Sequence, residues 1–315
     1  MKYLYLLILT SFVSLQVFSE EEKIEEIVSV GSSVSQKKEE TNTTIDVIEK
    51  KDLKRFASNS LISILNGYLG IDTSSNGGLG QYASVFLRGS NSNHTLVKVN
   101  GVKINPSTAG GASISNIDPS LISRIEVGSG PFSAIHGSEA IGGVINISTF
   151  PEEKDSSLQL SFSGGADNYR KESFQKNWLI KGDSYHIFLL KAKSEGFPSL
   201  MTSSIDSGFI NKSLGGSYTA EKDKTQAFIS TWVSKGQTEY LDFQSSPLSQ
   251  TYENSVHSLK FTFEHKDPYM LYLNLASSKD FINQNQINYI NPVSYTHLRA
   301  HETLRYLVCR LVLEK

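Results

Sequence analysis

The sequence predicts a small α+β domain followed by the first strands of an antiparallel transmembrane β-barrel that is cut short. Strands and short helices are interleaved over residues 45–150, which is typical of a compact α+β domain. Beyond residue 150, apolar and polar side chains alternate, as expected for strands with one buried face. The connections between these later strands alternate between tight turns and long polar loops, a pattern found in outer-membrane barrels.

Composition excludes several classes of protein. The chain of 315 residues is long enough for about two ordinary domains, and its net charge of −2 gives no reason to expect a nucleic-acid partner. No run of about 18 apolar residues occurs, which excludes a helical membrane protein but not a barrel, whose strands place only alternate residues in lipid. Cys309 is the only cysteine, so neither a disulfide framework nor a cysteine metal site is expected.

Residues 1–19 are predicted to be a signal peptide. Lys2 supplies a short positive region, and an almost continuous apolar stretch follows it over residues 3–13. Val17 and Ser19 occupy the usual cleavage offsets, which places the cut after Ser19. The apolar stretch is too short to span a bilayer, so an N-terminal anchor is the weaker alternative.

Residues 20–44 are polar and charged and are expected to form a flexible leader. A β-prone island at residues 24–30 interrupts this leader. Such a segment can add as an extra strand to the sheet edge of a partner, with main-chain hydrogen bonds supplying most of the affinity. From these residues alone, a chance apolar island in a linker is the simpler interpretation.

The predicted α+β domain occupies residues 45–150. A helix is expected at residues 50–66, where five apolar residues share one face, with a break or a new cap at residues 58–60. Asn100-Gly101 is a strong hairpin signal. Strands are expected at residues 45–48, 85–89, 95–99, 102–104, 123–127 and 142–147, and short helices or turns at residues 117–122 and 133–140.

Residues 151–291 are predicted to form roughly seven barrel strands, whereas bacterial barrels use an even number of about 8 or more. Tyr185, Ile187 and Leu189 illustrate the alternation. A soluble β-sandwich is the alternative, which the signal peptide and the alternating connection lengths disfavour. Tight turns are expected at residues 181–183, 220–224 and 265–268, and long loops at residues 194–208 and 236–254.

Residues 292–315 do not fit the barrel pattern. Apolar residues now recur at helical spacing, and the segment resembles translated adaptor or vector sequence found at the ends of unrelated reading frames. We therefore expect residues 292–315 to be non-native and the native reading frame to continue into further hairpins; an unusual C-terminal helix is the alternative. His297 and His301 lie four residues apart, but we assign them no metal because the segment itself is in question.

Three stretches of the α+β domain form a recognisable set of motifs. They are Asn76-Gly-Gly-Leu-Gly-Gln to His94, Leu96-Val-Lys-Val-Asn-Gly to Asn105, and Ile122-Ser-Arg-Ile-Glu-Val through Gly130-Pro131 to Ile147. Together they resemble the plug domain of TonB-dependent outer-membrane receptors. The resemblance covers residues 45–149 and extends to about residue 290 in strand pattern only; residues 76–105 are most similar to the cobalamin branch. It implies a plug seated inside a barrel and active uptake of a large, scarce ligand.

This resemblance changes the interpretation of the island in the leader. The island then looks like a TonB box that pairs as a strand with the periplasmic end of TonB, the partner that delivers energy from the inner membrane. The outer membrane itself holds no ATP or ion gradient. The expected TonB-binding residues are Glu26, Ile27, Val28, Ser29 and Val30.

By similarity, the loops around Gly77 to Gly80 and at residues 106–112 are the plug apices that face the outside. The glycines let a loop turn sharply and bring backbone amides toward a ligand. A neutral surface of amides and one aromatic ring suits a corrinoid, whereas an anionic iron–siderophore would favour Arg or Lys. The candidate ligand contacts are Asn76, Leu79, Gln81, Tyr82, Ala109 and Gly110.

Three charged residues on predicted strands are candidates for a lock between plug and barrel wall: Arg88, Arg124 and Glu126. Charge-assisted hydrogen bonds would form such a lock. An internal salt bridge of the plug is the equal alternative. The sequence departs from the family pattern at Asn100, Ser129 and His136, and it has no Asp-rich cluster resembling the calcium loops of cobalamin receptors.

The sequence therefore predicts TonB-dependent transport of cobalamin or a related corrinoid across the outer membrane, by a protein exported to that membrane and embedded in its lipid. An iron–siderophore or haem receptor of the same family is the alternative ligand class, and a passive porin or structural barrel is the alternative of another class. His94, His136 and His186 have no catalytic neighbours at suitable spacing, so no enzyme, cofactor or metal is expected.

Overall fold

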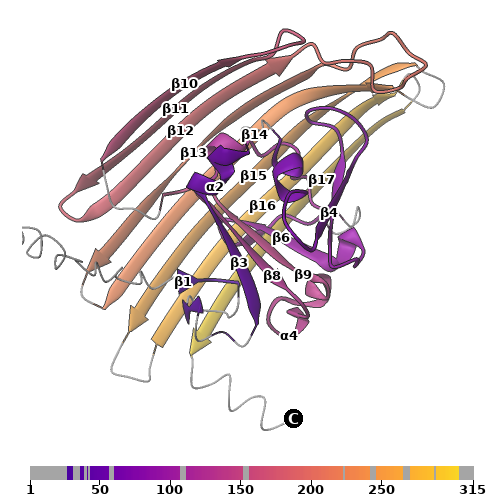
Figure 1. Ribbon diagram of the computed structural model, residues 1–315. Coiled ribbons are helices and arrows are strands. Elements are labelled where there is room, and N and C mark those ends of the chain that lie inside the picture. The colour runs from indigo at the N-terminus through magenta and orange to yellow at the C-terminus, as the bar shows by residue number, and fades with distance from the viewer. Residues whose placement is uncertain are drawn as a thin grey trace, which may run out of the picture.

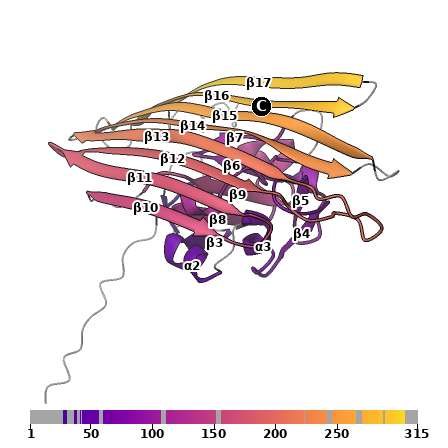
Figure 2. The ribbon, with the colours of Figure 1, turned by 90° about the horizontal axis from the view of Figure 1, so that it is seen from above.

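The computed structural model consists of a small domain packed against one face of a long curved sheet (Figure 1). The turned view in Figure 2 shows the small domain on one side of that sheet only. The predicted signal peptide at residues 1–19 lies outside the described residues. The structure describes residues 27–30, 36–38, 41, 43–56, 60–106, 111–151, 156–222, 224–241, 246–264, 270–286 and 289–304.

A five-stranded sheet forms the centre of the small domain, in the order β3-β8-β9-β6-β7. β6 and β9 are parallel, and the other neighbouring pairs are antiparallel. Every residue of β9 is buried, because this central strand is covered on both faces. The strands are β3 (Thr44–Glu49), β6 (Thr95–Val99), β7 (Val102–Lys103), β8 (Arg124–Ser129) and β9 (Gly143–Ser148).

The predicted helix at residues 50–66 is two helices, α2 (Lys50–Arg55) and α3 (Leu61–Leu65). Ser60 caps the second helix, with its hydroxyl accepting from the backbone N–H of Ser63 at 3.5 Å. The break or new cap that the sequence predicted at residues 58–60 is thus found at Ser60. The remaining short helices are η2 (Ser92–His94), η3 (Pro119–Leu121), α4 (Ser133–His136) and η4 (Ser138–Ala140).

A separate hairpin of β4 (Ile71–Ser75) and β5 (Ala83–Leu87) projects from the small domain. Residues 76–82 connect its strands and are called the apex loop. The predicted hairpin at Asn100-Gly101 is confirmed: both residues have positive φ, 53° and 80°, and Val99 pairs with Val102.

The long sheet is an antiparallel meander in the order β10 to β17, and it is called the wall sheet. Seven of its eight strands, β10 to β16, lie within residues 151–291, in agreement with the roughly seven predicted there, and β10 and β17 lie at opposite edges. The strands are β10 (Ser157–Gly164), β11 (Arg170–Ile180), β12 (Asp183–Ser194), β13 (Phe209–Lys222), β14 (Thr225–Leu241), β15 (Pro247–Glu264), β16 (Met270–Gln286) and β17 (Tyr289–Leu304).

The wall sheet has one face toward the small domain and one apolar face exposed. On β12, Phe188 and Leu190 are buried, whereas Ile187 and Leu189 are 42% and 55% exposed. This is the predicted alternation. Among the described residues no helix is both long and apolar enough to cross a membrane. Other exposed apolar side chains of the wall sheet are Leu158, Leu160, Phe162, Leu179, Leu214, Ile229, Leu259 and Leu275.

One prediction about the wall sheet is wrong. Residues 236–254 are not a loop, because β14 continues to Leu241, β15 begins at Pro247, and Gly236 pairs with Tyr252. Polar strand ends lack apolar alternation, so their composition resembles that of a loop. Residues 292–304 lie in β17, paired along β16, which disagrees with the alternative of a C-terminal helix over this stretch; that residues 292–315 are non-native remains a prediction. Residues 305–315 lie outside the described residues.

Candidate functional site

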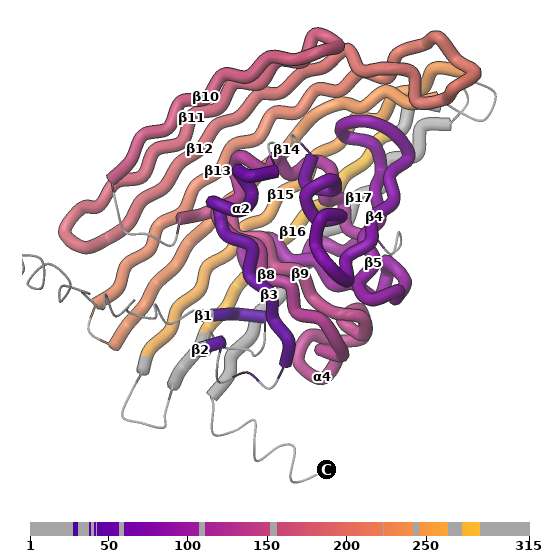
Figure 3. The backbone as a smooth tube through the Cα atoms, viewed as in Figure 1, coloured from indigo at the N-terminus to yellow at the C-terminus, as the bar shows by residue number. Residues whose placement is uncertain are grey.

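The leader segment, residues 27–30, is held on the small domain close to β8 and β9. Its β1 (Ile27–Val28) pairs with β2 (Gln36–Lys37), with Val28 opposite Gln36. Figure 3 shows this short hairpin beside β3 and β8. Glu26 and the rest of the island at residues 24–26 lie outside the described residues.

Glu126 on β8 is the principal acceptor for this leader segment. One carboxylate oxygen, Oε2, accepts from the backbone N–H of Ser29 at 2.9 Å, from the Ser29 hydroxyl at 2.9 Å, and from the backbone N–H of Val30 at 3.1 Å. The other oxygen, Oε1, lies 3.5 Å from Nη2 of Arg124, and both side chains are buried. The segment is therefore held by charge-assisted bonds to one side chain rather than by a long strand ladder.

His136 completes the contact with the leader segment. Its Nε2–H donates to the carbonyl of Val30 at 2.8 Å, while its Nδ1 accepts from Nζ of Lys98 at 3.1 Å. Burial, together with the cation of Lys98, lowers the pKa of His136 from 6.5 to about 4. His136 is therefore neutral in the docked arrangement, with its proton on Nε2.

Val30 also anchors the leader segment by packing. Its side chain is 1% exposed and belongs to an apolar cluster with Leu96, Phe132, Ala140 and Val144. Gly128 makes room for it, since a Cβ at that position would lie 2.5 Å from Cγ1 of Val30. The Val30 pocket is thus built by β8, β9 and the α4 region together.

The predicted ligand residues divide between exposed and occupied positions. Asn76 and Tyr82 are exposed on the apex loop, and Leu79 is half-buried against the core. Gln81 is 5% exposed and donates from Nε2 to the carbonyl of Glu239 on β14, so it connects the apex loop to the wall sheet. Ala109 and Gly110 lie outside the described residues.

The glycines of the apex loop serve its contact with the wall sheet. A Cβ on Gly78 would lie 3.2 Å from the ring of Phe197, and a Cβ on Gly80 would lie 2.2 Å from the ring of Phe209. Gly80 also has a φ of +73°, and its carbonyl accepts from Oγ1 of Thr238 at 3.2 Å. Close approach of aromatic side chains, in addition to turning, explains why glycine occupies these positions.

The three predicted lock residues take different places. Arg88 follows β5 in an exposed turn with a φ of +48°. Arg124 and Glu126 form a salt bridge with each other inside the small domain, which was the alternative considered for them. Whether any of the three locks the small domain to the wall remains a prediction.

Lys171 on β11 makes a buried ionic contact between wall and small domain that sequence reasoning missed. Its Nζ lies 3.2 Å from Oδ1 of Asp118, and the two side chains are 7% and 6% exposed. Ser173 and Gln175 lie two and four positions after Lys171 and share its inward face of β11. Gln175 donates from Nε2 to the carbonyl of Ser120 at 2.8 Å. In the sequence, Lys171 falls at the same period-two positions as the inward-facing residues of β11. A charged residue at such a position could have revealed this contact.

Asn116 forms a second polar contact with the wall. Its carbonyl accepts from Nδ2 of Asn211 at 2.9 Å and from the hydroxyl of Ser234 at 3.3 Å. Its Nδ2 donates to Oδ1 of Asn254 at 3.0 Å. Amides and hydroxyls thus connect Asn116 to β13, β14 and β15.

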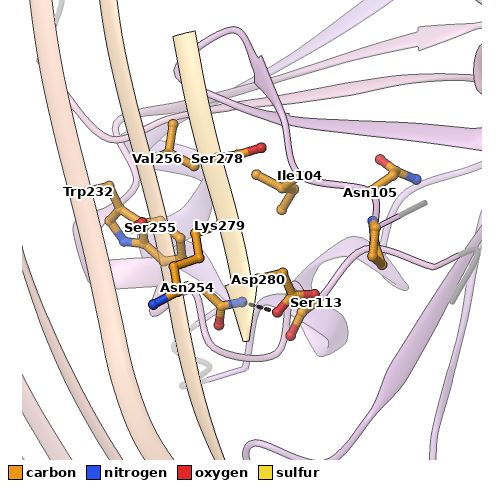
Figure 4. Close-up of a pocket in the computed structure, with 11 residues that line it drawn as sticks. Ile104, Asn105, Ser113, Trp232, Asn254, Ser255, Val256, Ser278, Lys279 and Asp280 are labelled. Carbon is orange, nitrogen blue, oxygen red and sulfur yellow. Dashed lines mark hydrogen bonds between the residues drawn. The ribbon is translucent and has the colours of Figure 1, made fainter. Parts of the chain in front are cut away.

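A small cavity of about 10 Å³ lies beside this contact (Figure 4), large enough for about one water molecule. Ile104, Asn105 and Ser113 line it from the small domain. Asn254 donates to Oδ1 of Asp280 at 2.6 Å on the opposite side, where the wall strands pass. The space is too small for a transported ligand, so it is part of the packing between the two bodies.

Comparison with known proteins agrees with this architecture. Residues 37–144 match the TonB-dependent Receptor Plug Domain. The Vitamin B12 transporter BtuB of Vibrio vulnificus (strain YJ016) is 32% identical over 240 residues, covering 75% of this chain and 39% of that protein. The chain thus spans about two fifths of the length of this curated relative.

Solved receptors have the same fold. The siderophore receptor PiuA from Acinetobacter baumannii superposes with a TM-score of 0.62 at 19% identity, covering 78% of this chain and 37% of PiuA. The alcaligin outer-membrane receptor FauA from Bordetella pertussis superposes with a TM-score of 0.68 at 12% identity, covering 87% of this chain and 46% of FauA.

A plug domain joined to an antiparallel wall sheet defines a receptor of the plugged-barrel class. The chain belongs to the TonB-dependent receptor family, and within it resembles the vitamin B12 branch. The small domain is the plug domain, and the wall sheet is part of the barrel. Members of this family are transporters rather than enzymes, in agreement with the sequence prediction.

Proposed function

We propose that this protein carries out TonB-dependent active transport of cobalamin or a related corrinoid across the outer membrane. The leader segment acts as the TonB box, and the apex loop contributes to ligand binding. The observation that carries the proposal is the docking of the leader segment on Glu126 and His136.

This docking suits a segment that must be exchanged between two partners. The backbone N–H groups of Ser29 and Val30 are satisfied by a side-chain carboxylate. A strand of TonB could satisfy the same groups with its own carbonyls, so the exchange loses few hydrogen bonds. Ile27 and Val28 are already extended in β1, the conformation that strand addition requires.

The choice of a corrinoid rests on the neutral apex loop and on the similarity to a vitamin B12 transporter. Asn76 and Tyr82 are exposed there, and an amide and a phenol can hydrogen-bond to the amide side chains of a corrin ring. An anionic iron–siderophore would gain more from Arg or Lys at these positions.

The exposed apolar face of the wall sheet supports a place in the outer membrane. Ile187, Leu189 and Leu214 are about half exposed, at 42%, 55% and 52%, which is unfavourable in water and favourable in lipid. The signal peptide predicted at residues 1–19 would export the protein to that membrane.

Deletion of residues 24–30 from the chromosomal gene of the source organism tests the proposal. We expect cells with this deletion to bind radiolabelled cyanocobalamin at their surface but to accumulate none, because binding does not need TonB whereas transport does. Accumulation equal to that of unaltered cells would contradict energy coupling and favour a passive porin. Binding of a ferric siderophore but not of cyanocobalamin would favour the alternative receptor class.

A further inference from the structure

A cavity of about 250 Å³ lies between the apex loop and the ends of the wall strands. The plug domain contributes Gly78 and Leu79 to its lining. The β10–β11 turn and the β12–β13 connection supply most of the remainder. These wall residues are Gly164, Gly165, Ala166, Asp167, Tyr169, Ser194, Gly196, Phe197, Ser207 and Phe209.

Aromatic rings and glycine backbone dominate this cavity. Tyr169 and Phe209 are 8% and 6% exposed, so their positions are fixed by packing, whereas Phe197 is 52% exposed. The ring of Phe197 lies against Gly78, where a Cβ would be 3.2 Å away. Flat groups stack well on such rings and on bare peptide planes.

The frame around the cavity is already ordered by hydrogen bonds. The carbonyl of Asp167 accepts from the backbone N–H of Glu195 at 2.8 Å and from the hydroxyl of Ser194 at 3.2 Å. Within the β12–β13 connection, Ser207 N–H donates to the carbonyl of Phe197 at 3.2 Å. A preformed site loses less entropy when a ligand binds.

Volume and charge restrict what the cavity can hold. Pockets that enclose drug-sized ligands measure about 300–1,000 Å³. A space of about 250 Å³ is too small for a whole corrinoid but fits one ring-sized group. Its lining includes the carboxylate of Asp167 and neither lysine nor arginine, which disfavours an anionic group.

We infer that this cavity is a subsite for the neutral aromatic base of the corrinoid's nucleotide tail. The base stacks on Phe197, while the corrin ring and its amides lie toward Asn76 and Tyr82 on the apex loop. This inference rests on the proposed function, because it assigns one part of the same ligand to residues outside the apex loop.

The test compares two corrinoids by equilibrium binding to the full chain in detergent. Cyanocobalamin carries the base, and dicyanocobinamide has the same corrin ring without it. We expect Phe197→Ala to weaken cyanocobalamin binding about tenfold, the scale of one lost aromatic stack, and to change dicyanocobinamide binding less than about twofold. Phe197→Tyr keeps the ring and should restore affinity. Leu200→Ala, in the same connection but outside the cavity lining, is the matched control.

The outcomes separate the inference from the function on which it rests. Equal weakening of both corrinoids by Phe197→Ala, or no effect on either, overturns the subsite and leaves corrinoid transport standing. Failure of the unaltered chain to bind either corrinoid overturns the proposed function and the subsite with it. Selective loss of cyanocobalamin affinity, restored by Phe197→Tyr, supports both.

Discussion

At the scale of single residues, the docking of the leader segment depends on a few buried polar groups. Glu126 accepts three hydrogen bonds from Ser29 and Val30, and Arg124 balances its charge. Sequence reasoning identified Arg124 and Glu126 as noteworthy charges, with a lock to the barrel and an internal salt bridge as equal alternatives, but it did not connect Glu126 with the leader segment. It could not find the true contact because Ser29 and Glu126 are 97 residues apart, and no local pattern encodes such a pairing.

His136 makes this docking sensitive to acid. Its pKa is about 4 when docked, below the ordinary value of 6.5, because burial and the cation of Lys98 oppose protonation. Release of Val30 exposes His136 to water and removes part of this burial, so its pKa rises toward 6.5 even though Lys98 stays in place. The released state then binds more protons than the docked state, and docking weakens as the pH falls toward 4. Hydrogen exchange at the Ser29 and Val30 amides, corrected for intrinsic rates, should show protection lost over this window.

The substitution His136→Gln provides the control for this pH dependence. Glutamine can still donate to the carbonyl of Val30 but does not titrate, so protection in that variant should be constant across the same window. An unaltered chain with the same flat profile as His136→Gln would show that His136 does not control the docking.

Gly80 and Gly89 form a matched pair that separates backbone strain from packing. Their φ angles are nearly equal, +73° and +72°, but a Cβ on Gly80 would lie 2.2 Å from the ring of Phe209, whereas no atom lies within 4 Å of one on Gly89. Gly89→Ala should cost about 1 kcal/mol of unfolding free energy and Gly80→Ala about 1–3 kcal/mol more. Equal losses in urea unfolding would refute the close contact with the wall.

At the scale of elements, period-two alternation predicted most of the wall sheet, because strands such as β11 and β12 bury one face and expose the other. It failed at residues 236–254, where polar side chains occupy both faces of paired strand ends. The same alternation brings Lys171 and Gln175 inward on β11, although the partner Asp118 is not visible from local sequence. The apex loop was found from its glycines, but their aromatic neighbours were not.

The Lys171–Asp118 pair should be the main ionic anchor on β11. Lys171→Met leaves a buried carboxylate without its cation and should lower the unfolding free energy by about 3–5 kcal/mol. Adding Asp118→Asn removes the uncompensated charge and should recover part of that loss. Lys191→Met, at an exposed position of β12, should change stability by less than about 0.5 kcal/mol. A Lys171→Met variant as stable as Lys191→Met would show that the pair anchors nothing.

At the scale of the whole molecule, the contacts of the leader segment and of the wall lie on different parts of the plug domain. The leader segment bonds to Glu126 on β8, which lies between β3 and β9 in the central sheet. The wall contacts the segment from Asn116 to Ser120 and the apex loop, and its strands β15 and β16 also pack against β7 at the edge of the central sheet. A force on the leader segment would therefore reach β8 first, while the contacts with β7, β11 and β14 hold the plug in place.

The most direct test is the affinity of the full chain for the periplasmic domain of TonB, measured by titration calorimetry before and after Glu126→Gln. In the proposed function, docking competes with TonB for Ser29 and Val30, and charged hydrogen bonds contribute about 1.5–3 kcal/mol each. Weakening that docking should tighten TonB binding about tenfold or more, because a larger fraction of the leader segment is then free to pair. Glu139→Gln, which alters the ion pair with Lys103, should leave the affinity unchanged. Equal or weaker TonB binding by Glu126→Gln would contradict the account.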